Sequence, residues 1–296
     1  MEINETAVLD RRGFIQINGD EAKEFLQNII TNDMEKISEN RALFSSIFTP
    51  QGKYLYEFFI LKLSNGYLLE CEKEIASELI KIFNFYKLRS KVDLIDISKQ
   101  YTAIFISLEK FKEISKTKSS KGLATTYNKD LMYIDPRNEN LGAKIISKTQ
   151  NVLSIISSLN LKKVDSNKYY NKSFDLGIPQ INLNKLKDKI FGIENNLDEL
   201  GGIDFKKGCY IGQENTSRIK LRNKLRKRIL PIKKISGEIF ENDVIKYKDI
   251  EIGKIMIDTP YPFGLIKVVD PDLSEFIELE LICGDSKVKI LKPEWI

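Results

Sequence analysis

Hydrophobic positions in the first hundred residues follow two spacings, and each spacing predicts one kind of element. Apolar residues recur at helical spacing at positions 22, 25, 26, 29 and 30, and again at 75, 79, 82, 83 and 86. Strand-like patterns cover residues 13–18, 43–48, 54–63, 67–71 and 92–97, with turn signals at Pro50 to Gly52 and at Asn65-Gly66. Asn18 and Glu21 predict a capping box before the first helix. This order of elements predicts a layer of helices on a mostly antiparallel sheet.

The later patterns predict further helices and strands, followed by a separate β unit. Residues 109–122 are rich in Lys and Ser and lack periodicity, so a loop is expected there. Strands are predicted at 131–134 and 143–146, and helices at 152–159 and 165–176, with Gly177 ending the second helix. Pro231 is expected to break a strand. Short apolar runs between 232 and 296, separated by Gly, Pro and Asp, favour a small all-β barrel.

One stretch, residues 201–228, combines glycines, a cysteine and a run of basic residues. It opens with Gly201-Gly202 and places Cys209 between Gly208 and Tyr210. From Arg218 onward every second residue is basic, and period two is the spacing of a strand. A strand with one basic face is therefore predicted; its basic side chains are Arg218, Lys220, Arg222, Lys224 and Arg226.

The basic charge of the chain is concentrated in this stretch. Residues 206–228 hold nine Lys or Arg and one acid, Glu214, so they carry +8, and the other residues sum to −3 in a chain of net charge +5. A local positive face favours an anionic partner. The alternative is a solvated edge strand that its charges protect from aggregation.

Composition excludes several kinds of site. The sequence of 296 residues has no histidine, so neither a Ser-His or Cys-His nucleophile pair nor a histidine-based metal site is possible. Cys71, Cys209 and Cys283 are odd in number and far apart, which argues against disulfides and against a cluster held by one chain; no metal site is expected. The first residues lack the pattern of a signal peptide and no long apolar run occurs. A cytoplasmic protein with no membrane partner is therefore expected.

The motif KGCYIGQE at 207–214, with Arg218 four residues later, resembles the signature of the YgfZ family of folate-binding proteins, which is related to the glycine-cleavage T-protein. Other segments resemble the same family: FLQNIITND at 25–33, FTPQGKYLYEF at 48–58, and FGIENNLDELGGIDF at 191–205. The likeness covers most of the first 230 residues. It implies an α+β fold, with a T-protein-like folate-binding module of two mixed α/β subdomains in residues 1–228 and a small all-β barrel in residues 229–296.

The resemblance also implies a function, a cofactor and partners. It indicates a folate-binding accessory protein that supports assembly or repair of iron–sulfur clusters in client enzymes, including tRNA-modifying enzymes. The cofactor is tetrahydrofolate or a derivative, and the partners are iron–sulfur assembly proteins or client enzymes. Carried over to this sequence, Cys209 is the candidate catalytic residue, and the folate-binding candidates are Glu194, Lys207, Tyr210, Gln213, Glu214, Arg218, Lys220 and Arg222.

The chemistry of folate suits these residue types. A pterin ring needs a carboxylate for its N–H donors, which Glu194 provides, and its glutamate tail needs cations such as arginine. Lys206 and Lys207 would favour the thiolate of Cys209. Simpler interpretations are a surface glutamate at 194, a buried cysteine in a tight turn at 209, and Gln213 and Glu214 as loop-stabilising groups.

Two other functions remain open. The first is a tetrahydrofolate-dependent aminomethyl or one-carbon transferase of the T-protein type, with Glu57 as its acid; T-proteins have two adjacent acids there, whereas this chain has Tyr56-Glu57. The second is RNA binding by the basic strand. It is less favoured, because few aromatic residues lie between the charges to stack on bases.

Overall fold

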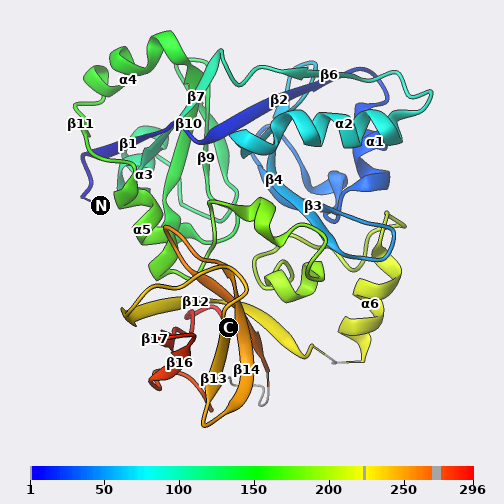
Figure 1. Ribbon diagram of the computed structural model, residues 1–296. Coiled ribbons are helices and arrows are strands. Elements are labelled where there is room, and N and C mark those ends of the chain that lie inside the picture. Colours follow the sequence, from blue (N-terminus) through cyan, green and yellow to red (C-terminus); the bar gives the residue numbers. More distant parts are fainter. Residues whose placement is uncertain (1, 223–224, 269–274) are drawn as a thin grey trace. The chain divides into compact units, whose positions relative to one another are not determined.

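A computed structural model describes residues 2–222, 225–268 and 275–296 of the chain (Figure 1). The chain forms two compact units, and each is made of three segments that alternate along the sequence. Unit 1 comprises residues 1–47, 56–172 and 200–211, and unit 2 comprises residues 48–55, 173–199 and 212–296. The predicted division of the chain after residue 228 stays a prediction.

The first sheet has six strands in the order β11-β1-β7-β10-β9-β8. Its register is antiparallel except for β1 and β11, which pair in parallel. The strands predicted at 131–134 and 143–146 are confirmed as its β9 and β10. Its strands are β1 (Glu5–Leu9), β7 (Tyr101–Ile106), β8 (Ala124–Tyr127), β9 (Asp130–Ile134), β10 (Ala143–Lys148) and β11 (Lys162–Lys163).

The second sheet has five strands in the order β3-β4-β5-β2-β6. Strand β2 pairs antiparallel with both β5 and β6, and β4 pairs antiparallel with β5. The predicted hairpins and strands of the first hundred residues are confirmed here. Its strands are β2 (Arg12–Asn18), β3 (Leu43–Phe48), β4 (Tyr54–Leu63), β5 (Gly66–Glu72) and β6 (Asp93–Asp96).

The two predicted helices beside this sheet are α1 (Ala22–Ile29) and α2 (Ala76–Lys87). The apolar stripe of α1 is buried, as its spacing predicts. The capping box is wrong: the residue that precedes α1 is Glu21, whose side chain makes no capping bond, because Asn18 is the last residue of β2. Short 3-10 turns are η1 (Met34–Lys36), η2 (Lys73–Ile75), η3 (Glu139–Leu141) and η4 (Thr149–Asn151).

The loop predicted at 109–122 is partly wrong, since α3 (Leu108–Ser115) occupies its first half. The hydroxyl of Ser107 accepts the N–H of Lys110 and so caps this helix. Helices α4 (Val152–Ser158) and α5 (Asn167–Asp175) are confirmed, and Gly177 follows α5 with a φ of +70°. No described helix is long and apolar enough to span a bilayer.

The C-terminal strands of unit 2 close into the predicted barrel, in the order β12-β15-β14-β13-β16-β17. Pro231 does not break β12, because the proline lies within the strand and its carbonyl accepts the N–H of Leu291. The barrel interior is filled by isoleucine, leucine and valine. Its strands are β12 (Lys227–Ser236), β13 (Val244–Tyr247), β14 (Ile250–Ile257), β15 (Phe263–Lys267), β16 (Leu281–Cys283) and β17 (Ser286–Ile290).

The predicted basic strand is wrong over most of its length. Residues Gln213–Leu221 form helix α6, which begins after Gly212 in the left-handed conformation (φ +82°). A helix places Arg218 and Glu214 one turn apart, and they form an ion pair. Leu221, which a strand would have buried, is exposed. Lys224 lies outside the described residues.

Candidate functional site

Residues 201–210 of unit 1 form a loop that carries Cys209. A buried lysine of this loop, Lys207, anchors it to the end of α1. The Nζ of Lys207 donates to the carbonyl oxygens of Gln27, Ile30 and Asn32 at 2.7, 2.7 and 2.9 Å. A cation is well placed at the C-terminal end of a helix, where carbonyl groups lack partners. Lys207 therefore fixes the loop on which Cys209 lies.

The same loop is joined to the residues after α1 by four more contacts. The Thr31 hydroxyl donates to the carbonyl of Gly202 at 2.6 Å, and the Asn32 amide donates to that of Gly201 at 2.9 Å. Asp204 donates its backbone N–H to Thr31 and forms an ion pair with Lys36. Segments 25–33 and 201–210, both identified by resemblance, thus contact each other directly in unit 1.

The surroundings of Lys207 add a role to those predicted for it. Burial lowers the pKa of Lys207 to about 8, although Asp33 and Asp204 act to raise it. Three carbonyls accept the three N–H groups of the ammonium form, so none is left for a ligand. These contacts give Lys207 a loop-anchoring role, and its predicted roles in folate binding and thiol activation stay predictions. Its Nζ also lies 5.1 Å from the ring centroid of Tyr210, whose pKa is raised by burial.

Cys209 differs from the other two cysteines in its exposure. Its side chain is exposed, and a Cβ placed on the preceding Gly208 would meet no atom within 4 Å. Cys71 and Cys283 are buried, and burial raises their thiol pKa values to about 12 and about 11. Among the three thiols, Cys209 is thus the accessible one.

In unit 2 the turn between β3 and β4 lies against the start of α6. The carbonyl of Thr49 lies so close to Gly212 that a Cβ there would approach it to 2.4 Å, and the Asn215 amide donates to the carbonyl of Gln51 at 2.8 Å. This contact requires glycine at position 212.

A second contact joins the hairpin to the short turn η6 (Gly192–Asn195), which carries Glu194. Phe48 packs so closely on Gly192 that a side chain there would clash with its ring. The Nζ of Lys53 lies 4.0 Å from the ring centroid of Phe191. Segments 48–54, 191–195 and 212–215, all within regions that the resemblance covers, therefore assemble in unit 2.

Glu194 is partly buried in this assembly. Its Oε2 accepts the backbone N–H of Phe191 at 2.8 Å. Burial raises the pKa of Glu194, while this hydrogen bond and the charges of Lys53 and Lys227 act to lower it. A carboxyl group in such surroundings can accept N–H donors of a ligand.

The other candidates of unit 2 lie on α6. Gln213 is its first residue, and Arg222 follows its last. Arg218 is paired with Glu214 at 2.8 Å, and Lys220 with Asp198 at 2.5 Å. The Arg218–Glu214 pair is largely exposed, and exposed pairs are weak, whereas Asp198 is only 20% exposed. A ligand carboxylate can therefore replace Glu214 at little cost.

Sequence reasoning missed a polar link between η6 and the barrel. The Asn196 amide donates to the carbonyl of Ile229, and its side-chain oxygen accepts from Arg228, which also pairs with Glu199. The signal available in the sequence is the asparagine itself, because asparagine adopts the left-handed conformation seen at Asn196 (φ +59°) more readily than most residues.

Sequence reasoning also missed a fully buried charge cluster in unit 1. Glu70 on β5 accepts from Arg12 on β2, and from Lys144 and Tyr133 of the other sheet. Burial acts to raise the pKa of Glu70, but Lys144 and Arg12 more than offset it and the pKa lies below its usual value. The cluster links the facing sides of the two sheets.

Glu57, the acid of the transferase hypothesis, is buried in the same unit. Its Oε1 lies 3.6 Å from the Nη1 of Arg137, which also binds Asp135. Glu57 is thus held in a buried ion pair.

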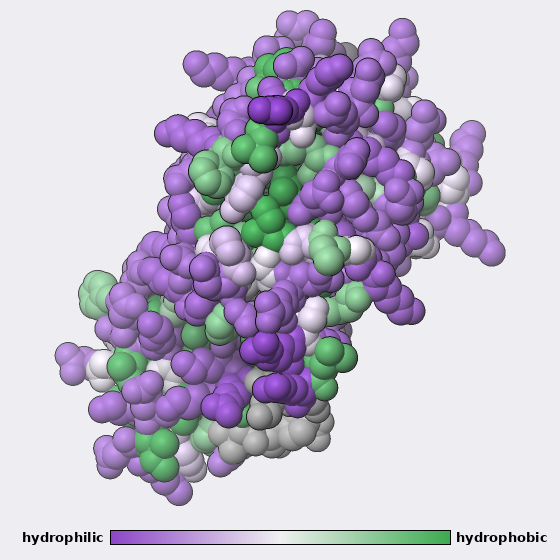
Figure 2. Space-filling view, turned by 90° about the vertical axis from the view of Figure 1, so that its right-hand side faces the viewer, coloured by the Kyte–Doolittle hydropathy of each residue, from purple (hydrophilic) through white to green (hydrophobic). Residues whose placement is uncertain are grey.

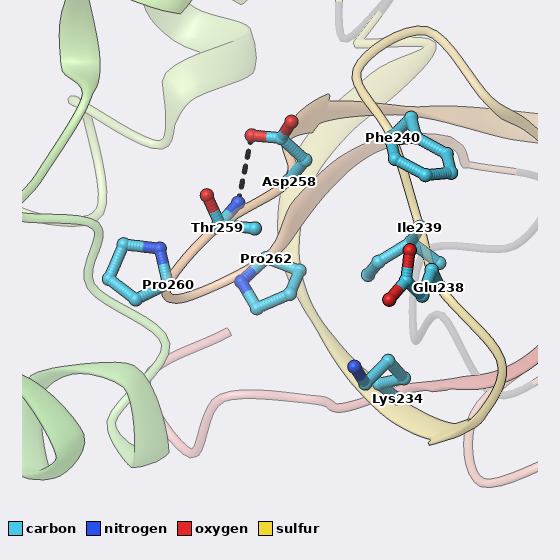
Figure 3. A pocket seen from close by; sticks show the side chains of 8 residues that line it. All are labelled: Lys234, Glu238, Ile239, Phe240, Asp258, Thr259, Pro260 and Pro262. Carbon is cyan, nitrogen blue, oxygen red and sulfur yellow. Dashed lines mark hydrogen bonds between the residues drawn. The ribbon is translucent and has the colours of Figure 1, made fainter.

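A separate cavity of about 400 Å³ lies in unit 2 at the barrel (Figure 3). Phe240, Pro260 and Pro262 surround it together with charged side chains, and the carboxylate of Asp258 accepts the N–H of Thr259. None of the residues predicted from the sequence lines it. Its lining is Lys234, Glu238, Ile239, Phe240, Asp258, Thr259, Pro260 and Pro262.

The described architecture matches a solved structure over nearly the whole chain. The glycine cleavage system aminomethyltransferase T from Bartonella henselae superposes with a TM-score of 0.74 over 99% of this chain and 86% of that protein, at 10% sequence identity. The fold is that of the T-protein. The predicted fold class, two mixed α/β regions with a C-terminal barrel on the T-protein plan, is thus confirmed.

Sequence comparison adds relatives of another name. The chain is 28% identical to the "Iron-sulfur cluster assembly factor IBA57 homolog, mitochondrial" of Neurospora crassa, over 93% of this chain and 61% of the relative. The proteins of the same name in Mycosarcoma maydis and Dictyostelium discoideum are 27% and 26% identical, over 76% and 84% of this chain and 56% and 64% of theirs. The chain thus spans less than two thirds of the length of these relatives. No family model matches it.

These relatives confirm one expectation and overturn another. The resemblance to iron–sulfur assembly proteins is confirmed, without the YgfZ family itself being named. The cytoplasmic localisation is wrong, because the relatives are named as mitochondrial proteins. That expectation relied on the first residues of a chain that covers only part of its relatives.

Proposed function

We propose that this protein is an accessory factor for the assembly or repair of iron–sulfur clusters in client enzymes, and that it binds tetrahydrofolate or a derivative. The observation that carries the proposal is the similarity to named iron–sulfur cluster assembly factors, combined with the T-protein fold. Membership of the YgfZ family, and clients that include tRNA-modifying enzymes, belong to the same proposal.

The residues proposed to bind folate come from the resemblance, and the local structure supports their chemistry. Glu194 accepts N–H donors of the pterin, and the exposed cations Arg218, Lys220 and Arg222 bind the acidic tail. Tyr210, Gln213 and Glu214 complete the set. Cys209 provides an accessible thiol beside the anchored loop.

Calorimetric titration with tetrahydrofolate tests the folate part of this proposal. We expect the Glu194→Gln variant to bind at least about tenfold more weakly, because a hydrogen bond to a charged group contributes about 1.5–3 kcal/mol. The amide oxygen of glutamine still accepts the N–H of Phe191, so the turn η6 is preserved. Arg218→Ala should also weaken binding.

Two exposed residues away from these segments serve as controls. Glu251→Ala on the barrel and Arg41→Ala remove one acid and one arginine, and both should bind like the wild type. Equal affinity of Glu194→Gln and Glu251→Ala would contradict the assignment of the pterin carboxylate. No heat of binding for the wild type would refute folate binding itself.

The assembly function needs a separate test in cells. Deleting the gene should lower the activity of iron–sulfur enzymes and leave an enzyme without a cluster unchanged. The wild-type chain should restore the activity. Unchanged activity of every iron–sulfur enzyme after deletion would refute the accessory role.

The transferase hypothesis ranks second and makes a different prediction. It requires formation of methylene-tetrahydrofolate from an aminomethyl donor, with Glu57 as the acid. The burial of Glu57 beside Arg137 disfavours it. RNA binding ranks last, because the basic strand on which it depended is largely a helix with paired charges.

A further inference from the structure

The end of helix α2 exposes two large apolar side chains. The opposite face of this helix, with Leu79 and Phe83, is buried. Phe85 is 75% exposed and Leu88, which follows the helix, is 88% exposed. Leu88 is the cap residue directly after the helix, three positions beyond Phe85. These two exposed apolar residues are named here the α2 tip.

Cations surround the α2 tip. Residues 79–92 contain Lys81, Lys87, Arg89 and Lys91 and no acid. None of the four makes an ion pair with another residue of the described chain, although the backbone N–H of Lys91 donates to the carboxylate of Glu21. Residues 79–92 thus carry +4, moderated by Glu21, by the exposed Asp93 of β6 and by the exposed Glu78, which lies one helical turn before Lys81.

Figure 1 draws the end of α2 toward the right-hand edge of the view, the side that Figure 2 faces. Green hydrophobic side chains lie there among purple hydrophilic ones in the upper part of the surface. The exposed fractions of Phe85 and Leu88 show that both side chains are open to solvent on the surface of unit 1.

We propose that the α2 tip binds the surface of an anionic lipid bilayer. Phe85 and Leu88 enter the boundary between headgroups and acyl chains, and Lys81, Lys87, Arg89 and Lys91 contact the anionic headgroups. This inference goes beyond the proposed function and does not depend on it. The sequence predicted no membrane partner, and the exposure of the tip is the observation that departs from that expectation.

The combination of charge and apolar exposure identifies lipid as the occupant. Aromatic and leucine side chains beside lysine and arginine are the pattern of interfacial segments. Anionic headgroups attract each nearby cation, and burial of a phenylalanine or leucine adds a comparable contribution. Leu153 is a useful contrast: it is also 75% exposed, but residues 149–161 carry no charge. Exposure alone is common on protein surfaces.

Flotation with vesicles tests the inference on the full chain. The protein should float with vesicles made of equal parts of phosphatidylcholine and phosphatidylserine, and not with phosphatidylcholine alone. Binding should weaken with added salt. The double variant Phe85→Ala/Leu88→Ala should bind at least about tenfold more weakly, and so should Lys87→Glu/Arg89→Glu.

Matched controls come from surfaces with only one of the two properties. Leu153→Ala removes an equally exposed leucine, and Lys116→Glu/Lys118→Glu reverses two exposed cations that have no exposed large apolar neighbour. Both should float like the wild type. If they weaken binding as much as the tip variants do, or if the wild type does not float, the inference is overturned.

A direct measurement of insertion complements flotation. In Phe85→Trp the new indole should shift its fluorescence to shorter wavelength when anionic vesicles are added. The wild type contains Trp295 as its one tryptophan, and its Nε1 donates to the carbonyl of Leu176. That signal should not change. Flotation without a shift in Phe85→Trp would refute insertion of the tip.

Discussion

At the residue scale, Lys207 shows how position changes the meaning of a side chain. In the sequence it stands two residues before Cys209 and reads as a cation that activates the thiol. In the structure its ammonium group is held by three carbonyls at the end of α1. These contacts fix the backbone of the loop on which the exposed Cys209 lies.

The difference among the three thiols leads to a prediction for alkylation. With iodoacetamide in native protein, Cys209 should react first, because it is exposed while burial raises the thiol pKa of Cys71 to about 12 and of Cys283 to about 11. Mass spectrometry of peptides gives the three rates. Cys209→Ser should abolish the fast phase, and unfolding in urea should equalise the rates. Equal, slow labelling of all three in native protein would contradict an accessible Cys209.

At the element scale, the basic run after Gly212 shows the limit of periodicity. Alternation over residues 218–226 is typical of a strand, yet α6 occupies residues 213–221. The pattern misled because the apolar residues of the alternation that the structure describes in α6 are not deeply buried: Ile219 is only half-buried and Leu221 is exposed. Where burial does not select a face, alternation is coincidental. The stripe of α1 and the strands β2 to β5 were predictable because their apolar faces are buried.

The cluster around Glu70 could not be predicted for a different reason. Arg12, Glu70 and Lys144 are far apart in the sequence, and each alone is typical of a solvated position on a strand. Arg12 and Glu70 lie on the neighbouring strands β2 and β5 of one sheet, and Lys144 reaches Glu70 from β10 of the other sheet. Such an ion pair depends on tertiary structure, so a local sequence pattern does not predict it.

Removing the charge of Glu70 should strongly destabilise the protein. Glu70→Gln leaves Arg12 and Lys144 buried without a carboxylate, and breaking such a pair costs about 3–5 kcal/mol. The control Glu35→Gln breaks the exposed pair with Lys23 and should cost about 0–1 kcal/mol. Urea unfolding measures both free energies of unfolding. Equal values for the two variants would contradict the role of the cluster.

The same experiment has a pH dependence of known sign. The pKa of Glu70 in the folded protein lies below its ordinary value of 4.5. The stability that its ionised form contributes is therefore fully present above pH 4.5 and is lost as the pH falls through the folded-state pKa. Wild-type stability should fall in that acidic range. The slope in Glu70→Gln should be smaller, because glutamine does not titrate.

At the scale of the whole molecule, the fold is better determined than the function. The T-protein match covers nearly the whole chain at 10% identity, so it shows architecture. The named assembly factors resemble the sequence but extend well beyond the length that the chain covers. Segments that resemblance picked out one by one assemble within the units, at Lys207 in one and at Gly212 in the other. The resemblance thus identified segments that contact one another within each unit. It did not predict the individual contacts, such as those of Thr31 and Asn196.

The proposed folate assignment leads to a last prediction, which concerns the alkylation of Cys209. If Cys209 lies beside bound folate, tetrahydrofolate should slow its alkylation, because the ligand shields the exposed sulfur. Glu194→Gln should label at the wild-type rate without folate, since glutamine keeps the hydrogen bond to the N–H of Phe191, and should show much less protection at the same folate concentration. The exposed control Glu251→Ala should retain full protection. Folate binding by calorimetry without any protection of Cys209 would separate the thiol from the folate site, and it would leave Cys209 as an accessible group whose partner is another molecule.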